Sequence, residues 1–289
     1  MTSADERLLA WALLSRASLT APATVRDLLT AHGPIGAAER IATDTRTPRF
    51  GPQTRTVAAH DLKRAQRIGV RLLTRDDPGW PDMLTDLDSI CAFAPIALWT
   101  RGSGQLNLLT EHAVAVVGAR ASTNYGDKVA THIASGLATQ GWTILSGGAF
   151  GIDAAAHQAA LDTGQPTMAV LPAGLHRLFP HGNAYLLASI EQTGLLVSEY
   201  PPGVEPSRAH FLARNRIVAA LATGIGVCEA GLRSGTANTV RWGNQLRRPV
   251  TAVPGPIDSA ASRGCHDFIR NGHAQLVVDA HDVLDVLAR

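Results

Sequence analysis

The sequence predicts an α/β protein in which a doubly wound, Rossmann-like parallel sheet is preceded by a small all-helical domain. From residue 113 onward, short apolar runs alternate with segments of helical length. Strands that are apolar throughout are typical of a parallel sheet covered by helices on both faces. The right-handed crossover rule then gives a doubly wound arrangement. The seven runs occupy residues 113–119, 142–148, 167–174, 194–200, 224–231, 248–255 and 274–280.

Residues 1–71 form the predicted helical domain, and residues 72–289 form the predicted extended Rossmann-like domain. Apolar spacing predicts helices over residues 6–16 and 57–68, and Pro22 opens another that Gly33 ends. A further short helix is expected over residues 36–42. The polar stretch 43–56 contains two Pro and one Gly and is predicted to be a loop. Residues 70–112 are expected to add two further strands.

Composition argues against several classes of protein. The formal net charge of +2 provides no strong long-range field. Cys91, Cys228 and Cys265 are widely spaced and form no CxxC pair, so neither a disulfide framework nor a zinc ribbon is supported. The first apolar run follows acidic residues, unlike a secretory signal, and the apolar stretches are too short to cross a membrane. We therefore expect a cytoplasmic protein with no membrane association.

The first apolar run of the predicted sheet leads into the candidate anion-binding residues Arg120 and Ser122. Arg120 falls where a strand gives way to a helix, and free backbone N–H groups at such a point suit an anion. Neither G-x-G-x-x-G nor G-x-x-x-x-G-K-[ST] occurs, which argues against a dinucleotide site and a P-loop. The alternative is that Arg120 is a surface arginine without a ligand.

The second run ends in a glycine-rich segment, Ser146-Gly147-Gly148-Ala149-Phe150-Gly151-Ile152-Asp153. Three glycines in five positions let a backbone approach a ligand closely. Asp153 and His157 lie one helical turn apart and could bind a metal or act as acid and base. We favour a structural interpretation in which Asp153 caps the helix and contacts His157, because no third ligand is evident.

Histidines follow the third run at positions 176 and 181. The pair is a weak indication of a metal site, since loop histidines at this spacing are common. Asn183 lies near a predicted helix start and is expected to cap it.

Arginines cluster after the fourth and fifth runs. Arg208, Arg214 and Arg216 lie within nine residues, with Phe211 and Asn215 among them. Arginine forks bind phosphates and a phenyl ring offers a stacking face, so the mixture is typical of nucleic-acid binding. A solvated helix start explains it equally well.

After the fifth run, Glu229 precedes the segment Arg233-Ser234-Gly235-Thr236 at a predicted helix start. Ser-Gly-Thr at a helix N-terminus is a common phosphate cradle. No G-x-S-x-G elbow is present, so nucleophilic catalysis has little support.

Seven blocks together resemble one known family. VAVVGAR, LSGGAFGIDAAAH, LPAGLHRLFPHGN, SEYPPG, RNRI, RSGTANT and AVPGPI occur in the order and spacing of the DprA/Smf family of DNA-processing proteins. The resemblance covers about residues 72–289, and the helical start resembles the family's small sterile-alpha-motif-like N-terminal domain. We expect no C-terminal winged-helix domain, which many members carry.

The resemblance implies a DNA-binding protein rather than an enzyme. Such a protein binds single-stranded DNA, self-associates as a dimer and loads the recombinase RecA during natural transformation and DNA recombination, without cofactor or metal. Residues 255–275 are the expected dimer interface. By position, Arg120 would grip a phosphate and Arg214 and Arg216 would flank the pocket. The expected DNA-contacting residues are Arg120, Ser122, Ser146, Gly147, Gly148, Phe150, Gly151, Asp153, His181, Asn183, Arg214, Asn215, Arg216, Arg233, Ser234, Gly235 and Thr236.

Two positions depart from the family pattern. Phe150 and His181 stand where members usually or often carry a basic residue. Fewer charges imply weaker DNA binding and a flatter salt dependence, although Phe150 could stack on a base. A diverged scaffold that keeps its protein partner but binds DNA poorly is therefore one alternative.

A second alternative is a phosphoribohydrolase or a nucleotide-sensing Rossmann protein. Glu229 followed by Ser234-Gly235-Thr236 loosely resembles the phosphoribohydrolase type. The acid expected just after Gly-Thr is missing, because Ala237 follows.

Overall fold

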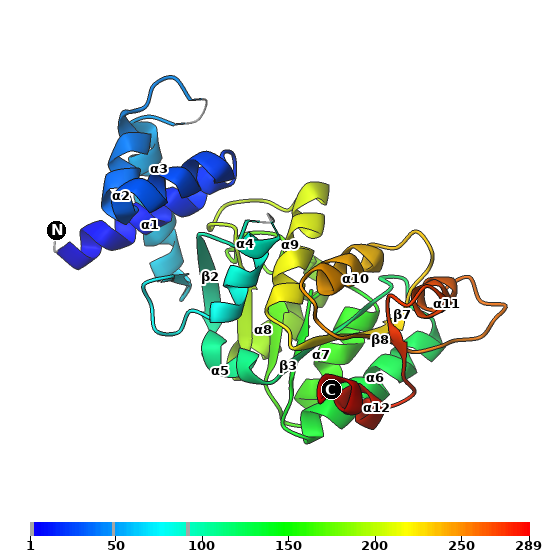
Figure 1. The fold of residues 1–289 in the computed structure, drawn as a ribbon. Coiled ribbons are helices and arrows are strands. Elements are labelled where there is room, and N and C mark those ends of the chain that lie inside the picture. The colour runs from blue at the N-terminus through cyan, green and yellow to red at the C-terminus, as the bar shows by residue number, and fades with distance from the viewer. Residues whose placement is uncertain (1–2, 48–49, 91–92) are drawn as a thin grey trace.

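The computed structural model describes residues 3–47, 50–90 and 93–289. Cys91 and part of the predicted loop 43–56 lie outside the described residues. Helices at the N-terminus form a bundle beside a larger α/β unit, as Figure 1 shows. No helix in these ranges is both long enough and apolar enough to cross a membrane.

The helical bundle consists of α1 (Ser3–Ser18), α2 (Pro22–Thr43) and α3 (Gln53–Arg67). The predicted break at Gly33 is confirmed: this residue has φ 65° and ψ 178°, which interrupts α2 just before Pro34. The predicted start of α3 at residue 57 is wrong. The helix begins at Gln53, because Pro52 already has helical dihedral angles and leads the chain into the first turn.

One mixed sheet contains all nine strands of the described residues, in the order β1-β2-β6-β5-β4-β3-β7-β8-β9. Each of the seven predicted apolar runs contains one of the parallel strands β3 to β9, so that prediction is confirmed. The two extra strands β1 and β2 form an antiparallel edge, and β2 also runs antiparallel to β6. The strands are β1 (Arg71–Thr74), β2 (Ala97–Gly102), β3 (Ala113–Gly118), β4 (Thr143–Ser146), β5 (Thr167–Val170), β6 (Leu195–Ser198), β7 (Gly224–Glu229), β8 (Val250–Ala252) and β9 (Gln275–Leu276).

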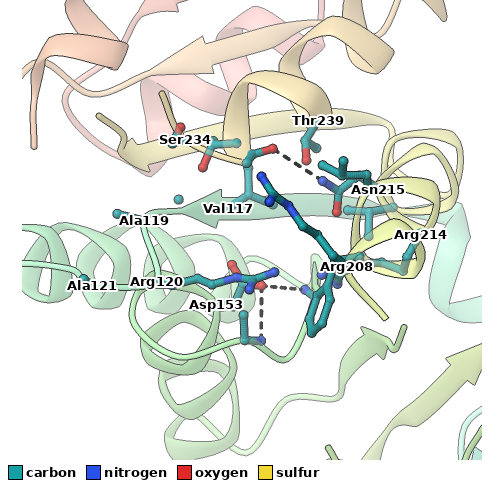
Figure 2. A pocket seen from close by; sticks show the side chains of 18 of the residues that line it. Val117, Ala119, Arg120, Ala121, Asp153, Arg208, Arg214, Asn215, Ser234 and Thr239 are labelled. Carbon is teal, nitrogen blue, oxygen red and sulfur yellow. Dashed lines mark hydrogen bonds between the residues drawn. The ribbon is translucent and has the colours of Figure 1, made fainter. Parts of the chain in front are cut away.

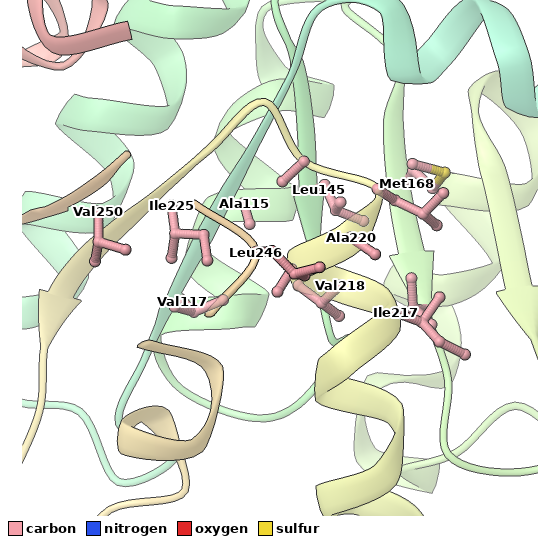
Figure 3. Packing of buried hydrophobic residues seen from close by; sticks show 14 of the residues in the cluster. Ala115, Val117, Leu145, Met168, Ile217, Val218, Ala220, Ile225, Leu246 and Val250 are labelled. Atoms are coloured by element: carbon pink, nitrogen blue, oxygen red, sulfur yellow. The ribbon is translucent and has the colours of Figure 1, made fainter. Parts of the chain in front are cut away.

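Helices cover both faces of this sheet. Alternate residues of β3 belong to different cores, since successive side chains of a strand point to opposite faces. Ala115 and Val117 pack with Ile217 of α9 (Arg208–Ala220) in one core (Figure 3), whereas Val114 and Val116 belong to the other. The remaining helices are η1 (Asp82–Thr85), α4 (Asp86–Ser89), α5 (Leu106–Glu111), α6 (Asn124–Thr139), α7 (Ile152–Asp162), η2 (His181–Asn183), α8 (Ala184–Thr193), α9 (Arg208–Ala220), α10 (Thr236–Gln245), α11 (Arg263–Arg270) and α12 (Ala280–Leu287).

The chain reverses its direction of winding next to β3. It proceeds from β3 through β4 and β5 to β6 on one side, and then crosses to β7 on the other side of β3. In doubly wound sheets a crevice opens at such a switch point, at the carboxyl ends of the strands. The fold therefore places the ends of β3 and β7 at the expected position of a ligand site.

The helical bundle shares a hydrophobic core with one edge of the sheet. Trp11 and Leu14 of α1 belong to the same buried cluster as Trp99 of β2 and Leu196 of β6. The Trp99 indole nitrogen donates a hydrogen bond to Ser15 Oγ at 3.2 Å. This packing holds the bundle firmly against the sheet, and a domain boundary after residue 71 remains a prediction.

Candidate functional site

A pocket of about 550 Å³ lies at the switch point of the sheet. Its walls come from the segments after β3, β4 and β7 and from one face of α9 (Figure 2). Nine of the predicted contact residues line it, namely Arg120, Gly147, Asp153, Arg214, Asn215, Arg233, Ser234, Gly235 and Thr236. The sequence therefore identified much of the lining of this cavity, and the role of these residues in DNA contact stays a prediction.

The glycine-rich loop after β4 is held in place by two buried polar side chains. The backbone N–H groups of Gly147 and Ala149 donate to Asp153 Oδ2 at 3.1 and 3.3 Å. Asn183 Nδ2 donates to the carbonyls of Gly148 and Ala149 at 3.1 and 3.0 Å. These contacts correct two expectations. Asn183 occupies the N-cap position of α8 without a capping bond from its side chain, and Asp153 holds the loop instead of capping α7.

Arg214 lies under this loop with only 4% of its surface exposed. One guanidinium nitrogen donates to the carbonyl of Val170 at 2.8 Å, while Nε has no hydrogen-bond partner among the described residues. A Cβ atom at Gly147 would overlap the guanidinium, so any other residue at this position would force Arg214 to move. Burial lowers the pKa of Arg214 to about 10, while nearby Asp153 favours its charged form. Burial also raises the pKa of Asp153. The floor of the pocket therefore carries the buried positive charge of Arg214, which the surrounding groups compensate only in part.

Aromatic rings pack together beside the pocket, and one of them, Phe211, lines it. The Arg120 guanidinium stacks over the ring of Phe211 at 4.2 Å from its centroid. Phe211 packs edge-to-face against Phe179 at 6.0 Å, and Phe179 in turn against His181 at 5.9 Å. The result is a cation on an aromatic surface, a combination that can meet both a phosphate and a base.

The N-terminus of α10 forms the opposite wall. Gly235 occupies the N-cap position and has no side chain to cap the helix. The N–H groups of Ala237 and Asn238 donate to the carbonyls of Ser234 and Gly235 within the same turn, at 3.3 and 3.1 Å. Ser234 Oγ is buried and has no hydrogen-bond partner among the described residues. Asn215 Nδ2 donates to the Gly235 carbonyl at 3.4 Å and joins α9 to this turn (Figure 2). Together with Arg233 beside it, this helix end suits an anion.

The structure also reveals pocket residues that the sequence prediction omitted. Arg208, Leu212 and Thr239 line the same cavity. The arginine cluster in residues 208–216 was the available signal for Arg208. Thr239 lies one helical turn beyond Thr236 and is recognisable as part of the site only once the helix is placed.

Eight predicted residues lie outside the pocket lining: Ser122, Ser146, Gly148, Phe150, Gly151, His181, Asn183 and Arg216. Some of these residues stabilise the strands beside the pocket. The hydroxyl of Ser146, for example, donates to the Val116 carbonyl at 2.6 Å. Ser122 bonds Asp127 instead of facing the cavity. Phe150 is 48% exposed and its ring lies against Gly182.

Arg216 makes a structural ion pair away from the pocket. Its guanidinium forms two hydrogen bonds to the carboxylate of Glu199, at 2.6 and 2.9 Å. The pair is largely buried in a separate cavity of about 400 Å³ between the helical bundle and α9. The expectation that Arg216 flanks the same pocket as Arg214 is wrong, because residues two apart on a helix face different directions.

The histidines form no metal centre within the described ranges, where no cluster of three potential ligands occurs. His157 contacts Thr167 Oγ1 at 2.7 Å rather than Asp153, which corrects the expected contact. The Thr167 hydroxyl donates to the Ile144 carbonyl, so His157 Nδ1 carries the proton and donates to Thr167. Burial lowers the pKa of His157 to about 3. His176 contacts Glu205 at 3.2 Å and Gly203, and these contacts use both ring nitrogens.

Glu229 is also committed to a structural role. It is 2% exposed and accepts hydrogen bonds from the hydroxyl and the backbone N–H of Thr123, at 2.6 and 2.8 Å. These bonds hold the start of α6. Among the described residues that line the pocket, Asp153 is the only acid.

Comparisons with known proteins agree with this architecture. The family model described as DNA recombination-mediator protein A matches residues 71–288. The chain is 44% identical to the putative DNA processing protein DprA of Mycobacterium tuberculosis over 293 aligned residues, covering 97% of this chain and 75% of that protein.

Two solved structures are also similar. The structure of DNA processing protein A from Streptococcus pneumoniae matches with a TM-score of 0.80 and 33% identity, covering 94% of this chain and 95% of that one. The protein of the same name from Helicobacter pylori matches with a TM-score of 0.66 and 28% identity, covering 76% and 95%. That structure is described for its single-stranded DNA binding mode. The chain therefore belongs to the family of DNA recombination-mediator protein A, the DprA/Smf proteins.

Proposed function

We propose that the pocket at the switch point binds the phosphate backbone of single-stranded DNA. The observation that carries the proposal is the charge of the lining: Arg120, Arg208, Arg214 and Arg233 surround a cavity whose one acid among the described residues, Asp153, is buried beneath it. The N-terminus of α10 adds the partial positive charge of its helix dipole on the same side. The single-stranded DNA binding mode described for the Helicobacter pylori relative supports the same ligand.

The aromatic side of the pocket favours a single strand over a duplex. Unpaired bases can stack on a phenyl ring, and such stacking contributes about 1–3 kcal/mol per base with little sequence preference. The Arg120 guanidinium stacks on the ring of Phe211. A phosphate bound by Arg120 would therefore place its neighbouring base close to this ring. Phe150 is a second candidate for stacking, because it is exposed beside the loop that lines the pocket.

The site is proposed to bind and not to catalyse. Asp153 accepts two backbone N–H groups, and Glu229 is saturated by Thr123. Neither acid is positioned as a general acid or base at the cavity surface, and this geometry weighs against the phosphoribohydrolase alternative.

We extend the proposal to the family's partners. The chain would act as a homodimer that places RecA on incoming single strands in natural transformation, without cofactor or metal. Exposed Ile257 and Leu276 lie in or next to the expected interface of residues 255–275. Sedimentation analysis checks the dimer. Capture of RecA, with and without an oligonucleotide, checks the second partner; no capture in either condition contradicts RecA loading.

The first test is a titration of a fluorescent oligo-dT by anisotropy at two salt concentrations, with Arg120→Ala alongside. We expect submicromolar binding that weakens with salt, because each neutralised phosphate contributes about 0.7 to the slope of log K against log salt. Arg120→Ala should weaken binding strongly and lower that slope. Arg241→Ala on α10, an exposed arginine outside the pocket lining, is the matched control.

Two results would redirect the interpretation. Absence of binding at low salt would contradict the proposal and leave the diverged scaffold, which RecA capture without an oligonucleotide shift would then support. Release of free base from a nucleoside monophosphate would establish the phosphoribohydrolase alternative.

A further inference from the structure

A basic face on α3 lies outside the proposed DNA pocket. His60, Lys63, Arg64 and Arg67 recur at helical spacing, and all four are exposed. None of them makes an ion pair within the described part of the chain. These residues line a shallow hollow of about 460 Å³ together with Asp61. Asp61 adds little opposing charge, because it is buried and bonded to Arg16 by two contacts, one of 2.8 Å.

This face meets the loop that leads into the pocket. An Arg64 guanidinium nitrogen lies 2.5 Å from the position that a Cβ of Gly203 would take. Gly203 belongs to the segment between β6 and α9, and this segment ends at Arg208, which lines the pocket. Five residues span at most about 17 Å. Phosphates in a stacked strand repeat about every 3.4 Å, so the gap corresponds to about five nucleotides or fewer.

Two acids lie along this path. Glu199 is held in an ion pair by Arg216, while Glu205 is largely exposed and contacts His176 at 3.2 Å. The position of α3 is also fixed, because the bundle shares its core with β2 and β6 and Arg26 of α2 pairs with Asp88 at 2.6 Å. The basic face therefore keeps a defined position relative to the pocket.

We propose that the basic face of α3 is a second phosphate-binding surface that continues the path of a single DNA strand leaving the pocket. The inference rests on the proposed function. From position 60 to position 67 the helix advances about 10 Å, which matches about three successive phosphates. Lysine and arginine side chains in a row are suited to a backbone of regular charge, and continuity with the arginine-lined pocket favours a nucleic acid over an acidic protein segment.

The test compares oligonucleotides of increasing length on the full chain. The variant Lys63→Ala/Arg64→Ala/Arg67→Ala removes the three formal charges and keeps good helix formers at exposed positions. A matched control, Lys128→Ala/Arg241→Ala/Arg289→Ala, removes three exposed charges on α6, on α10 and at residue 289, outside the expected dimer interface, and none of the three makes an ion pair in the described ranges. Circular dichroism verifies that both variants are folded.

We expect the α3 variant to bind short oligo-dT, which fills only the pocket, like the unmodified chain. For long oligo-dT its affinity should fall roughly ten- to hundredfold, and its salt slope should flatten by about 2, or 0.7 for each of three lost contacts. The control should retain both affinities. Identical length dependence in the α3 variant and the unmodified chain would overturn the inference alone, as would an equal loss in the control. If the unmodified chain binds no oligonucleotide at any length, the proposed function fails together with the inference.

Discussion

Two cavities of this protein contain buried arginines from the same helix, yet their electrostatics differ. In the pocket at the switch point, Arg214 has no carboxylate within ion-pair distance among the described residues, and its Nε lacks a partner. In the cavity between the bundle and α9, Arg216 is bound at two points by Glu199. An arginine that is paired with a carboxylate stabilises the fold. A buried arginine whose charge is only partly compensated favours binding of an anion. The presence or absence of a carboxylate partner therefore distinguishes the structural contact from the proposed binding site more clearly than the solvent exposure of the two arginines does.

The largest effect is expected for the stability of the fold when Arg216, the arginine paired with a carboxylate, is replaced. Arg216→Ala leaves Glu199 buried without its partner, and breaking such a pair costs about 3 kcal/mol or more. Denaturant unfolding should show this loss of stability. Oligonucleotide affinity of the folded variant should change little. A stable Arg216→Ala variant with lost DNA binding would contradict the division between the two cavities.

A smaller loss of stability is expected from Gly147→Ala, accompanied by lost binding. The new methyl group would displace the Arg214 guanidinium from beneath the loop, and overpacking of this kind typically costs about 1–3 kcal/mol. Anisotropy should show weaker oligo-dT binding in a protein that still unfolds cooperatively. Gly79→Ala, where an added Cβ meets only ordinary contacts, is the control. Unchanged binding in Gly147→Ala would mean that the position of Arg214 does not matter to the ligand.

The smallest effect concerns the rim of the pocket. Phe150→Lys restores a charge that the family usually carries beside the glycine-rich loop, at an exposed position that tolerates the change. If a phosphate passes there, the salt slope should steepen by about 0.7. Leu108→Lys, a comparably exposed apolar residue on α5, controls for the added charge. Weaker binding with an unchanged slope in Phe150→Lys would indicate that the phenyl ring itself stacks on the strand.

The amino-acid pattern locates the strands well but places the polar contacts less well. Short apolar runs mark buried strands whatever their neighbours, so the positions of β3 to β9 follow from the sequence alone. The expected partners of Asp153, Asn183 and His157 are wrong. Asn183 and His157 bond to segments that the fold brings near, and Asp153 bonds to the loop that precedes its helix. Local spacing suggests caps and i,i+4 pairs, and it contains no information about such distant contacts.

The sequence by itself therefore determined the α/β class, the family and the identity of the glycine- and arginine-rich segments, since these depend on local periodicity and on motifs in order. Only the tertiary structure decided which groups each arginine contacts. It placed Arg214 under the glycine-rich loop, turned Arg216 toward Glu199 and set the basic face of α3 beside the loop that leads into the pocket. The physical reason is that charge acts through distance in space, and the packing of a sheet and its helices fixes those distances.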